Sequence, residues 1–323
     1  MSKKVLFIGD LHLNEWAMFS HPISFNGKTM NSRLVEQLNV LEQILLVISK
    51  NSYQKVVLLG DIFHRFTPQT FFVFDLFMKE LTKMVKEVIL VIGNHDYIDE
   101  SRKLTYFDYF GYPLKVVKDY EIIDGIGYLA FTRDEEIGNH RLKKFLEKGV
   151  EILVMHNNVE DMPLPQGIRT KGLSKILLKK FKFVFNGHYH TFNEYKTLTG
   201  NYFNIGAIMD TSFVDANTGA KGVFEFDFST YKYQRFLTQY KQFLILRKEE
   251  LESLSEEMKR NCYIRVKVEV DELKDIKEKE ILDIVIKPRK KEFKVLTLEE
   301  VLKEVAKDYK DSELAEKFIF SLL

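Results

Sequence analysis

Five apolar segments of this chain each end in an aspartate, asparagine or histidine, and this repetition limits the possible folds more than any other feature. The central segment, Val56–Pro68, reads VVLLGDIFHRFTP, with Asp61 directly after Gly60 and His64 three residues later. A continuous apolar run that ends at glycine is typical of a buried strand in a sheet covered on both faces. Ligands of open α/β sheets lie just beyond the carboxyl ends of the strands. We therefore expect the chemistry to be centred on Asp61.

The same pattern occurs four more times along the chain. The other segments are VLFIGDLH at Val5–His12, VILVIGNHD at Val88–Asp96, VEILVMHNN at Val150–Asn158 and FKFVFNGHYH at Phe181–His190. Six of the eight histidines lie at these strand ends, namely His12, His64, His95, His156, His188 and His190. Only His21 and His140 lie elsewhere, a distribution that histidines scattered over a core and a surface would not give.

Composition limits the class of protein and its compartment. The 323 residues, 45% of them hydrophobic, predict a sizeable core in two domains or in one large domain with an appendage. The net charge of +1 gives no global field that attracts nucleic acid, although a local basic groove would suffice. The single Cys262 forbids an intramolecular disulfide, and the N-terminus reads as a first strand and not as a signal peptide. These features predict a cytoplasmic protein, and no apolar run approaches the roughly 18 residues of a membrane span.

Strand and helix patterns alternate over the first 240 residues or so, which predicts an α/β sandwich. The expected helices span Leu34–Ile48, Phe71–Lys86, Arg141–Lys148 and Leu173–Lys180. Residues 112–131 and the segment from Tyr202 onward have the periodicity of short strands. The polar and aromatic connection Asn14–Met30 carries an Asn26-Gly27 turn signal. It is expected to form either an ordinary surface loop or part of a substrate wall.

The composition shifts near Leu244, and a small α+β appendage is expected to follow. Arg247–Arg260 is charged and helix-prone, Tyr263–Val270 alternates as a half-buried strand should, and Leu282–Ile286 reads as a second strand. The predicted domains are residues 1–243, a small capping domain over 244–296 and a C-terminal helical segment over 297–323. The last segment opens with a capping box at Thr297–Glu300 and carries two apolar stripes. Its two short helices either pack on their own domain or dock a partner.

The side chains at the strand ends are the ligand types that a pair of transition metals requires. Seven of them are candidate ligands: Asp10, His12, Asp61, Asn94, His156, His188 and His190. Asp10 and His12 stand two residues apart on one strand end, and two of the other histidines repeat that spacing, so each pair can point the same way. Imidazole, carboxylate and amide ligands together suit manganese, iron or zinc, whereas magnesium and calcium prefer oxygen ligands alone. A binuclear hydrolytic site also requires a carboxylate that can bridge two ions about 3.5–4 Å apart.

Taken in order, the motifs D-x-H, GD-x-x-H, GNHD, a strand-end histidine and GH-x-H resemble those of the calcineurin-like metallophosphoesterase superfamily over about residues 1–240. The resemblance implies a four-layer αββα sandwich and a binuclear metal centre. The resemblance assigns four ligands to each ion. One ion would be held by Asp10, His12, Asp61 and His190, and the other by Asp61, Asn94, His156 and His188, so that Asp61 bridges the two. It also implies that His95 is the catalytic histidine, which stabilises the transition state or protonates the leaving oxygen. Asp96 follows His95 directly and is expected to orient its ring, as an outer carboxylate does.

Within the superfamily, the segment GDIFHRFTPQT around His64 resembles the SbcD-type recombination nucleases. The segment after GH-x-H, with Gly206 and Lys221-Gly222, is similar to the corresponding part of the same subfamily. Ala207-Ile208 departs from the usual Ser-Pro pair at this place. The chain also lacks the long tail of cellular members, which is compatible with a viral or phage version.

The SbcD-type resemblance implies a metal-dependent DNA nuclease subunit for double-strand-break repair and recombination. The implied activities are a 3′→5′ double-strand exonuclease and a single-strand endonuclease with Mn²⁺ as the preferred ion, and Fe, Zn or Mg as alternatives. Two ions would lower the pKa of a bridging water, and the hydroxide would attack phosphorus in line. The implied partners are DNA, an SbcC-type coiled-coil ATPase docked on residues 297–323, and a second copy of the chain in a homodimer. The protein would lie at the nucleoid, or in the host cytoplasm if it is viral.

Several interpretations stay open at the sequence level. His64 would position the phosphate or DNA, or would only make a structural hydrogen bond behind the ligands. The basic groups Arg169–Lys171, Lys179-Lys180 and Lys287–Lys291 are candidate DNA contacts or ordinary solvated surface. The same site would also serve a phosphatase or a cyclic-nucleotide phosphodiesterase. A non-catalytic scaffold is the third alternative, although such proteins usually lose ligands and none is missing here.

Overall fold

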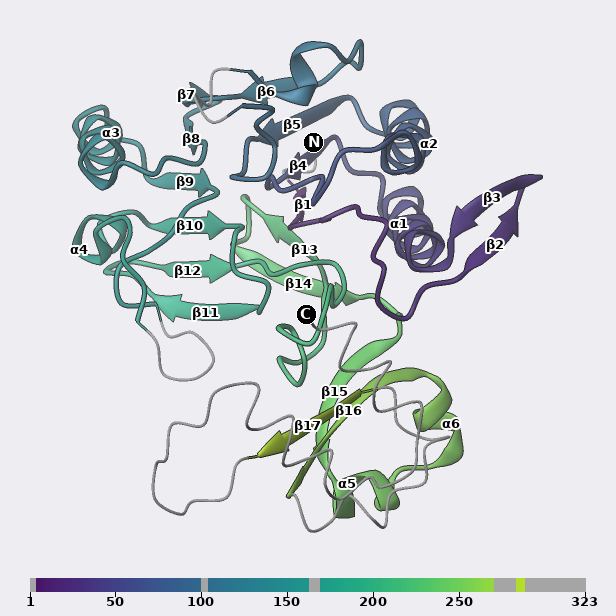
Figure 1. The fold of residues 1–323 in the computed structure, drawn as a ribbon. Coiled ribbons are helices and arrows are strands. Elements are labelled where there is room, and N and C mark those ends of the chain that lie inside the picture. Colours follow the sequence, from purple (N-terminus) through teal and green to yellow (C-terminus); the bar gives the residue numbers. More distant parts are fainter. Residues whose placement is uncertain (1–3, 100–103, 163–168, 270–282, 288–323) are drawn as a thin grey trace, which may run out of the picture. The chain divides into compact units, whose positions relative to one another are not determined.

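Two six-stranded sheets dominate the computed structural model, which describes residues 4–99, 104–162, 169–269 and 283–287 (Figure 1). The chain divides into two compact units, one of residues 1–267 with 277–285 and one of residues 268–276 with 286–323. The first unit contains all the predicted site residues and is the one described below. The predicted C-terminal helices over 297–323 lie outside the described residues, and the domain boundaries at 243 and 296 stay predictions.

The first sheet is mostly parallel and is built around β1. Its strands in spatial order are β14 (Lys232–Leu237), β13 (Gly222–Asp227), β1 (Lys4–Ile8), β4 (Lys55–Leu58), β5 (Glu87–Val91) and β6 (Lys115–Val117). The strands from β1 to β6 pair in parallel, and β13 runs antiparallel to both of its neighbours. The parallel strands therefore bring their carboxyl ends to one edge.

The second sheet repeats this plan. Its strands in spatial order are β11 (Asn193–Lys196), β12 (Asn201–Asn204), β10 (Phe183–Asn186), β9 (Ile152–Met155), β8 (Ile126–Leu129) and β7 (Tyr120–Ile123). The four central strands are parallel, and the two edge strands are antiparallel to them.

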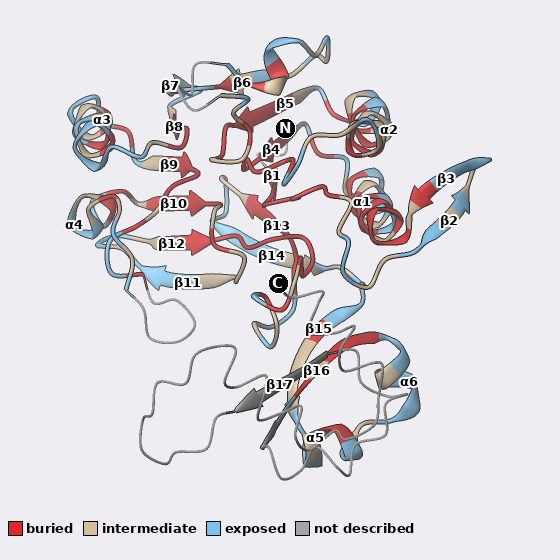
Figure 2. Ribbon diagram, in the orientation of Figure 1, coloured by how far each residue is buried: buried red, intermediate tan, exposed pale blue. Residues whose placement is uncertain are grey.

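Side chains alternate along each strand between two different cores. On β1, Val5 and Phe7 belong to a cluster shared by both sheets, whereas Leu6 and Ile8 face the cluster that includes α1 and α2. The rings of Phe7 and Phe185, from opposite sheets, stack with centroids 4.4 Å apart. A third cluster lies between the second sheet, α3 and α4. These layers, helix, sheet, sheet and helix, confirm the predicted α/β fold of the αββα type (Figure 2).

The four outer helices begin and end where local capping allows. They are α1 (Ser32–Asn51), α2 (Pro68–Met84), α3 (Glu135–Glu147) and α4 (Lys175–Leu178). The Asn31 side chain accepts the backbone N–H groups of Arg33 and Leu34 in the first turn of α1, and Thr67 caps α2 with Pro68 in its first turn. The helix predicted at Arg141–Lys148 begins six residues earlier, because the Asp134 carboxylate accepts two N–H groups there.

The connection after β1 contains a hairpin that the sequence did not predict. Strands β2 (Pro22–Phe25) and β3 (Lys28–Asn31) pair antiparallel around the predicted turn at Asn26-Gly27. Asn26 and Gly27 both have a positive φ, as a tight two-residue hairpin turn requires. The turn signal is therefore correct, and the connection contains two short strands in addition to loop.

A third, three-stranded sheet follows the sandwich. It consists of β15 (Gln242–Arg247), β16 (Cys262–Glu269) and β17 (Asp283–Lys287), with α5 (Lys248–Ser253) and α6 (Glu256–Arg260) between the first two strands. The charged, helix-prone segment therefore forms two short helices, separated at Leu254 and Ser255. The two predicted strands lie within one residue of β16 and β17. None of the helices in the described residues is long and apolar enough to cross a membrane.

Candidate metal centre

The carboxyl ends of five parallel strands from both sheets carry all seven predicted ligand residues (Figure 1). Three of these strands, β1, β4 and β5, belong to the first sheet, and two, β9 and β10, belong to the second. Asp10, His12, Asp61 and His156 are buried, and Asn94, His188 and His190 are partly buried. The ligand assignments themselves stay predictions, but the fold brings the side chains together as the strand-end pattern implied.

Four atoms in one part of the centre lie at the separations that ligands of a single ion have. Asn94 Oδ1 lies 2.9 Å from His188 Nδ1 and 3.3 Å from His156 Nε2. The two imidazole nitrogens are 3.3 Å apart, and His156 Nε2 lies 3.4 Å from Asp61 Oδ2. Ligand bonds of about 2.1 Å place neighbouring ligand atoms about 3–3.5 Å apart. The set therefore fits one divalent ion.

The outer hydrogen bonds of the two histidines turn their free nitrogens toward this position. His156 Nδ1 bonds to the carbonyl oxygen of Leu59, which leaves Nε2 facing the cluster. His188 Nε2 lies 2.7 Å from Asn158 Oδ1, which leaves Nδ1 facing it. Burial alone would lower the pKa of His156, but Asp61 and Asp10 raise it to about 9. The carboxylate oxygens of Asp61 and Asp10 therefore favour a positive charge at this position. A bound divalent ion would supply that charge, and His156 would release its proton.

The second group consists of Asp10, His12 and Asp61, whose ligand atoms lie within 4.8 Å of one another. His12 Nε2 is 3.5 Å from Asp61 Oδ2, so the Asp61 carboxylate faces both groups. Asp10 Oδ2 and His12 Nδ1 are buried and have no hydrogen-bond partner. A buried carboxylate oxygen without a donor is costly unless a cation satisfies it. The residues present therefore fit a binuclear divalent centre.

His190 reaches the second group through a carboxylate that the sequence analysis missed. Its ring lies 4.8 Å from the His12 ring between centroids, and its Nδ1 is 2.7 Å from Asp215 Oδ1. Burial alone would raise the pKa of Asp215, but His190 and the Thr211 donors hold it well below its usual range. The ionised carboxylate fixes the His190 ring so that Nε2 is free for an ion. Asp215 follows no strand and repeats no motif, so only the folded chain reveals this role.

Three of the predicted ligands have a strained backbone. His12, Asp61 and His188 have φ values of 45°, 50° and 75°, in the left-handed region that residues other than glycine rarely adopt. Gly93 is required for a different reason: a Cβ there would lie 2.3 Å from Asp61 Oδ1 and 2.9 Å from His156 Cε1. The glycine of the GNHD motif therefore lets the β5 loop approach the ligands closely.

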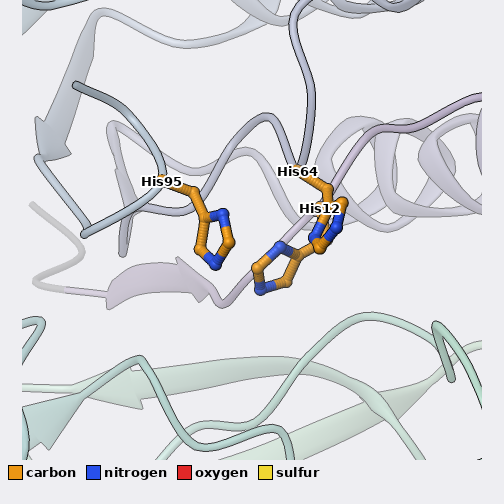
Figure 3. A group of neighbouring side chains, drawn as sticks. All are labelled: His12, His64 and His95. Atoms are coloured by element: carbon orange, nitrogen blue, oxygen red, sulfur yellow. The ribbon is translucent and has the colours of Figure 1, made fainter. Parts of the chain in front are cut away.

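The two predicted catalytic histidines, His95 and His64, both lie beside His12 (Figure 3). The His95 and His64 rings stack with centroids 5.0 Å apart, and the His95 ring lies 4.9 Å from His12. His64 is exposed and His95 partly buried, so both can meet a substrate. Trp16, from the connection after β1, packs on His64, with the two ring centroids 4.6 Å apart. One residue of that connection therefore lies at the candidate site, and its role as a substrate wall stays a prediction.

Asp96 has a different role from the predicted one. Its carboxylate accepts hydrogen bonds from the backbone N–H groups of Gly93, Asp61 and Ile62, at 2.8, 2.9 and 2.8 Å. These three donors, and not the His95 ring, occupy its oxygens. The His95 backbone N–H in turn donates to Asp61 Oδ1 at 2.8 Å. Asp96 therefore ties the β4 and β5 loops together, and its adjacency to His95 in sequence was misleading because the turn points the two side chains to different partners.

Replacing Asp96 by asparagine is expected to lower the free energy of unfolding by about 2 kcal/mol, because one amide oxygen cannot accept all three donors. Urea denaturation followed by circular dichroism measures the change. Asp134→Asn is the matched control, because Asp134 is an exposed helix cap and asparagine caps equally well. Equal stability losses in the two variants would contradict a tying role for Asp96.

The Ala207-Ile208 departure also has a structural counterpart. The Ala207 N–H donates to the His190 carbonyl oxygen at 3.1 Å, and the Ile208 N–H donates to the Asp10 carbonyl oxygen at 3.4 Å. A proline at position 208 would have no such donor. The segment therefore attaches to two ligand-bearing loops through backbone bonds that suit these two residues.

An αββα sandwich with two groups of candidate divalent-ion ligands at its strand ends is typical of a class of metal-dependent phosphoester hydrolases. The chain belongs to the calcineurin-like phosphoesterases, the family that matches residues 3–192, more than half of its length. It is therefore a metallophosphoesterase, in a family that uses binuclear divalent centres. No curated protein matches the chain.

Several solved structures are similar to the chain. An archaeal phosphodiesterase has 12% identity and a TM-score of 0.38, covering 72% of this chain and 99% of its own. A dimetal phosphatase from Danio rerio has 12% identity and a TM-score of 0.41, with 74% and 96% covered. A purple acid phosphatase from yellow lupin (Lupinus luteus) seeds has 11% identity and a TM-score of 0.42, with 73% and 53% covered. Likeness at this level carries no argument about substrate.

Proposed function

We propose that this phosphoesterase is a DNA nuclease of the SbcD type, which hydrolyses phosphodiester bonds of DNA as a 3′→5′ double-strand exonuclease and a single-strand endonuclease. The observation that carries the proposal is the exposed His64 ring stacked on His95 beside the ligand groups. A second imidazole at this place can bind an oxygen of a phosphodiester that His95 does not reach. The Trp16 ring beside it adds an aromatic surface at the entrance, on which a nucleobase can stack.

When bound, the divalent ions, for which we propose Mn²⁺, supply Lewis acidity toward the phosphate and a nucleophile at neutral pH. The residues of the chain do the rest. The Asp61 carboxylate faces both ligand groups and also accepts the His95 backbone N–H, so the backbone of the catalytic residue is held beside the centre. The His95 imidazole then donates a proton to the leaving oxygen, and His64 orients the phosphodiester.

Two further features of the fold support the nuclease proposal. The three-stranded sheet of β15 to β17 follows the sandwich, at the place where the SbcD-type resemblance implies a capping domain. Lys221, from the Lys221-Gly222 pair of that resemblance, is buried and donates to the His190 carbonyl oxygen at 2.8 Å. Exposed cations at Arg169, Lys171 and Lys179 are candidates for contacts with the DNA backbone.

The test incubates the purified protein and Mn²⁺ with end-labelled duplex and single-stranded DNA, and in parallel with bis(p-nitrophenyl) phosphate and a cyclic nucleotide. Degradation of DNA that is lost in the His95→Asn variant is the expected result. Turnover of the small esters with intact DNA would instead assign the site to a phosphatase or a cyclic-nucleotide phosphodiesterase. The DNA assay is repeated with the ATPase partner present, because a nuclease subunit can be silent without it.

We also propose that residues 297–323 dock an SbcC-type ATPase, that the subunit is a homodimer, and that it acts in the cytoplasm. Co-purification of the ATPase with the full chain, but not with a chain ending at residue 296, is the expected result. An equal yield of ATPase with both chains would place the docking site elsewhere. Sedimentation of the full chain measures the oligomer.

A further inference from the structure

Four buried charged side chains outside the ligand set connect the small sheet to the metal centre. They are Arg33, Lys221, Asp210 and Asp215, with exposed fractions of 1%, 1%, 4% and 3%. Burying a charge is costly unless it is paired and hydrogen-bonded. The hydrolytic chemistry described above uses none of these four groups directly, so their burial needs another explanation.

The first connection runs from His190 to Arg33. Asp215, which holds His190 Nδ1, uses its other oxygen to accept the Thr211 N–H at 2.8 Å and the Thr211 hydroxyl at 2.6 Å. The Thr211 carbonyl oxygen accepts from Arg33 Nη2 at 3.3 Å. Arg33 lies in the first turn of α1, far from the ligands in sequence. The orientation of the His190 ring is therefore linked, through two residues, to a guanidinium in another layer.

Arg33 is itself held by the small sheet. Its guanidinium carbon lies 4.8 Å from the ring centre of Phe243 on β15 and 4.7 Å from that of Tyr263 on β16. Arg33 Nε is 3.3 Å from Glu36, and the Tyr263 hydroxyl donates to Glu36 at 2.7 Å. The two rings also contact each other, with centroids 4.8 Å apart, so the guanidinium lies beside the pair and gains cation–π attraction from both. The place of Arg33 therefore depends on how β15 and β16 pack against α1.

A second connection reaches His190 from the same strand by a separate route. The Phe243 N–H donates to Asp210 Oδ2 at 3.1 Å, and the other oxygen of Asp210 lies 3.6 Å from Lys221 Nζ. Lys221 Nζ donates to the His190 carbonyl oxygen at 2.8 Å and to Thr218. The small sheet thus reaches the backbone of this ligand as well as its ring.

We propose that Arg33 is a positioning residue for the metal centre: through Thr211 and Asp215 it holds the His190 ring in the orientation that offers Nε2 to a divalent ion. The affinity of one of the two ions consequently depends on the packing of β15 and β16 against α1. A partner that displaces this sheet changes the metal affinity without touching a ligand. The inference rests on the metal-ligand assignment and not on the choice of DNA as substrate.

The test measures Mn²⁺ binding to the full chain by isothermal titration calorimetry and by electron paramagnetic resonance. Arg33→Lys keeps the charge but loses the planar fork that donates to the Thr211 carbonyl oxygen beside the two rings. The variant is expected to bind one of the two Mn²⁺ ions with about 10-fold lower affinity, as is usual when an outer contact of a metal-binding histidine is lost. Its affinity for the other ion should not change. Asp215→Asn is expected to lower the affinity for the same ion. The double variant should bind that ion no more weakly than Asp215→Asn alone, because both residues act through the same chain of hydrogen bonds to His190.

Tyr53→Phe is the matched control, because Tyr53 is a buried tyrosine whose hydroxyl bonds a different carboxylate, Glu225, outside the network. It should bind both Mn²⁺ ions as the wild type does. Phe243→Leu, which removes one ring from Arg33 and keeps an apolar side chain, serves if Arg33→Lys does not fold. The proposal is overturned if the variants at positions 33 and 243 fold and both of their Mn²⁺ dissociation constants stay within twofold of the wild-type values. If the wild-type chain binds no Mn²⁺, both the role of Arg33 and the ligand assignment are wrong. If it binds Mn²⁺ but does not cleave DNA, only the nuclease proposal is contradicted.

Discussion

Replacing Asp61 by alanine is expected to remove both divalent ions and to lower phosphoester turnover about 10³-fold or more. The Asp61 carboxylate is the oxygen donor that faces both ligand groups, at 3.5 Å from His12 Nε2 and 3.4 Å from His156 Nε2. Burial alone would raise the pKa of Asp61, but the charge and hydrogen bond of His156 hold it well below the usual range, so the carboxylate is ionised and able to bridge. Its removal would also free the His95 backbone N–H. Metal analysis after gel filtration and turnover of a chromogenic diester measure the two effects.

Glu225→Gln is the control for Asp61→Ala. Glu225 is a buried carboxylate in the same sheet, but it bonds Tyr53 and lies outside the ligand groups. The Glu225→Gln protein should retain two ions per chain. An Asp61→Ala protein that also retained two ions would exclude the bridging role and would require another carboxylate to hold the pair.

The second large effect is expected from His95→Asn, which should retain both ions and still bind the substrate but lose about 10²–10⁴-fold in turnover. His95 is none of the predicted ligands, and its ring lies beside His12, 5.0 Å from His64 between centroids. Asparagine cannot deliver a proton to a leaving oxygen near neutral pH. Metal content, substrate affinity and turnover are measured on the same preparation.

A substrate with a good leaving group separates proton delivery from other roles of His95. A p-nitrophenolate leaves without protonation, so the loss in His95→Asn should be smaller for a nitrophenyl ester than for an alkyl ester. His140→Asn is the control, because His140 lies in α3, away from the strand ends. Turnover in His95→Asn equal to that of the control would remove His95 from the chemistry.

The strand-end pattern was sufficient to predict the central layers and the position of the site. Buried parallel strands read as continuous apolar runs because both faces are covered, and the polar residue that follows each run necessarily lies at the sheet edge. The segments ending at Asp10, Asp61 and His156 illustrate this, since each follows a strand whose last three residues are buried. These signals are local, so one sequence contains them.

The contacts that orient the ligands could not be predicted, because they join residues far apart in the chain. Asp215 reaches His190 over 25 residues and Asn158 reaches His188 over 30. The prediction that Asp96 orients the His95 ring failed for a related reason. Its partners are set by backbone donors of two loops, and one of these donors is 35 residues away. The β2–β3 hairpin was missed because its strands are short and largely exposed, and so lack an apolar pattern.

The left-handed backbone at His12, Asp61 and His188 has a consequence for how such a protein changes under selection. Each of these residues holds a conformation that costs about 1–3 kcal/mol and that glycine adopts freely. A laboratory population selected for heat resistance alone would therefore gain by accepting glycine at these positions. It would lose the metal centre while the sandwich became more stable. Thermal robustness and hydrolytic competence thus favour different residues at the same three places, and a screen for one must retain a test of the other.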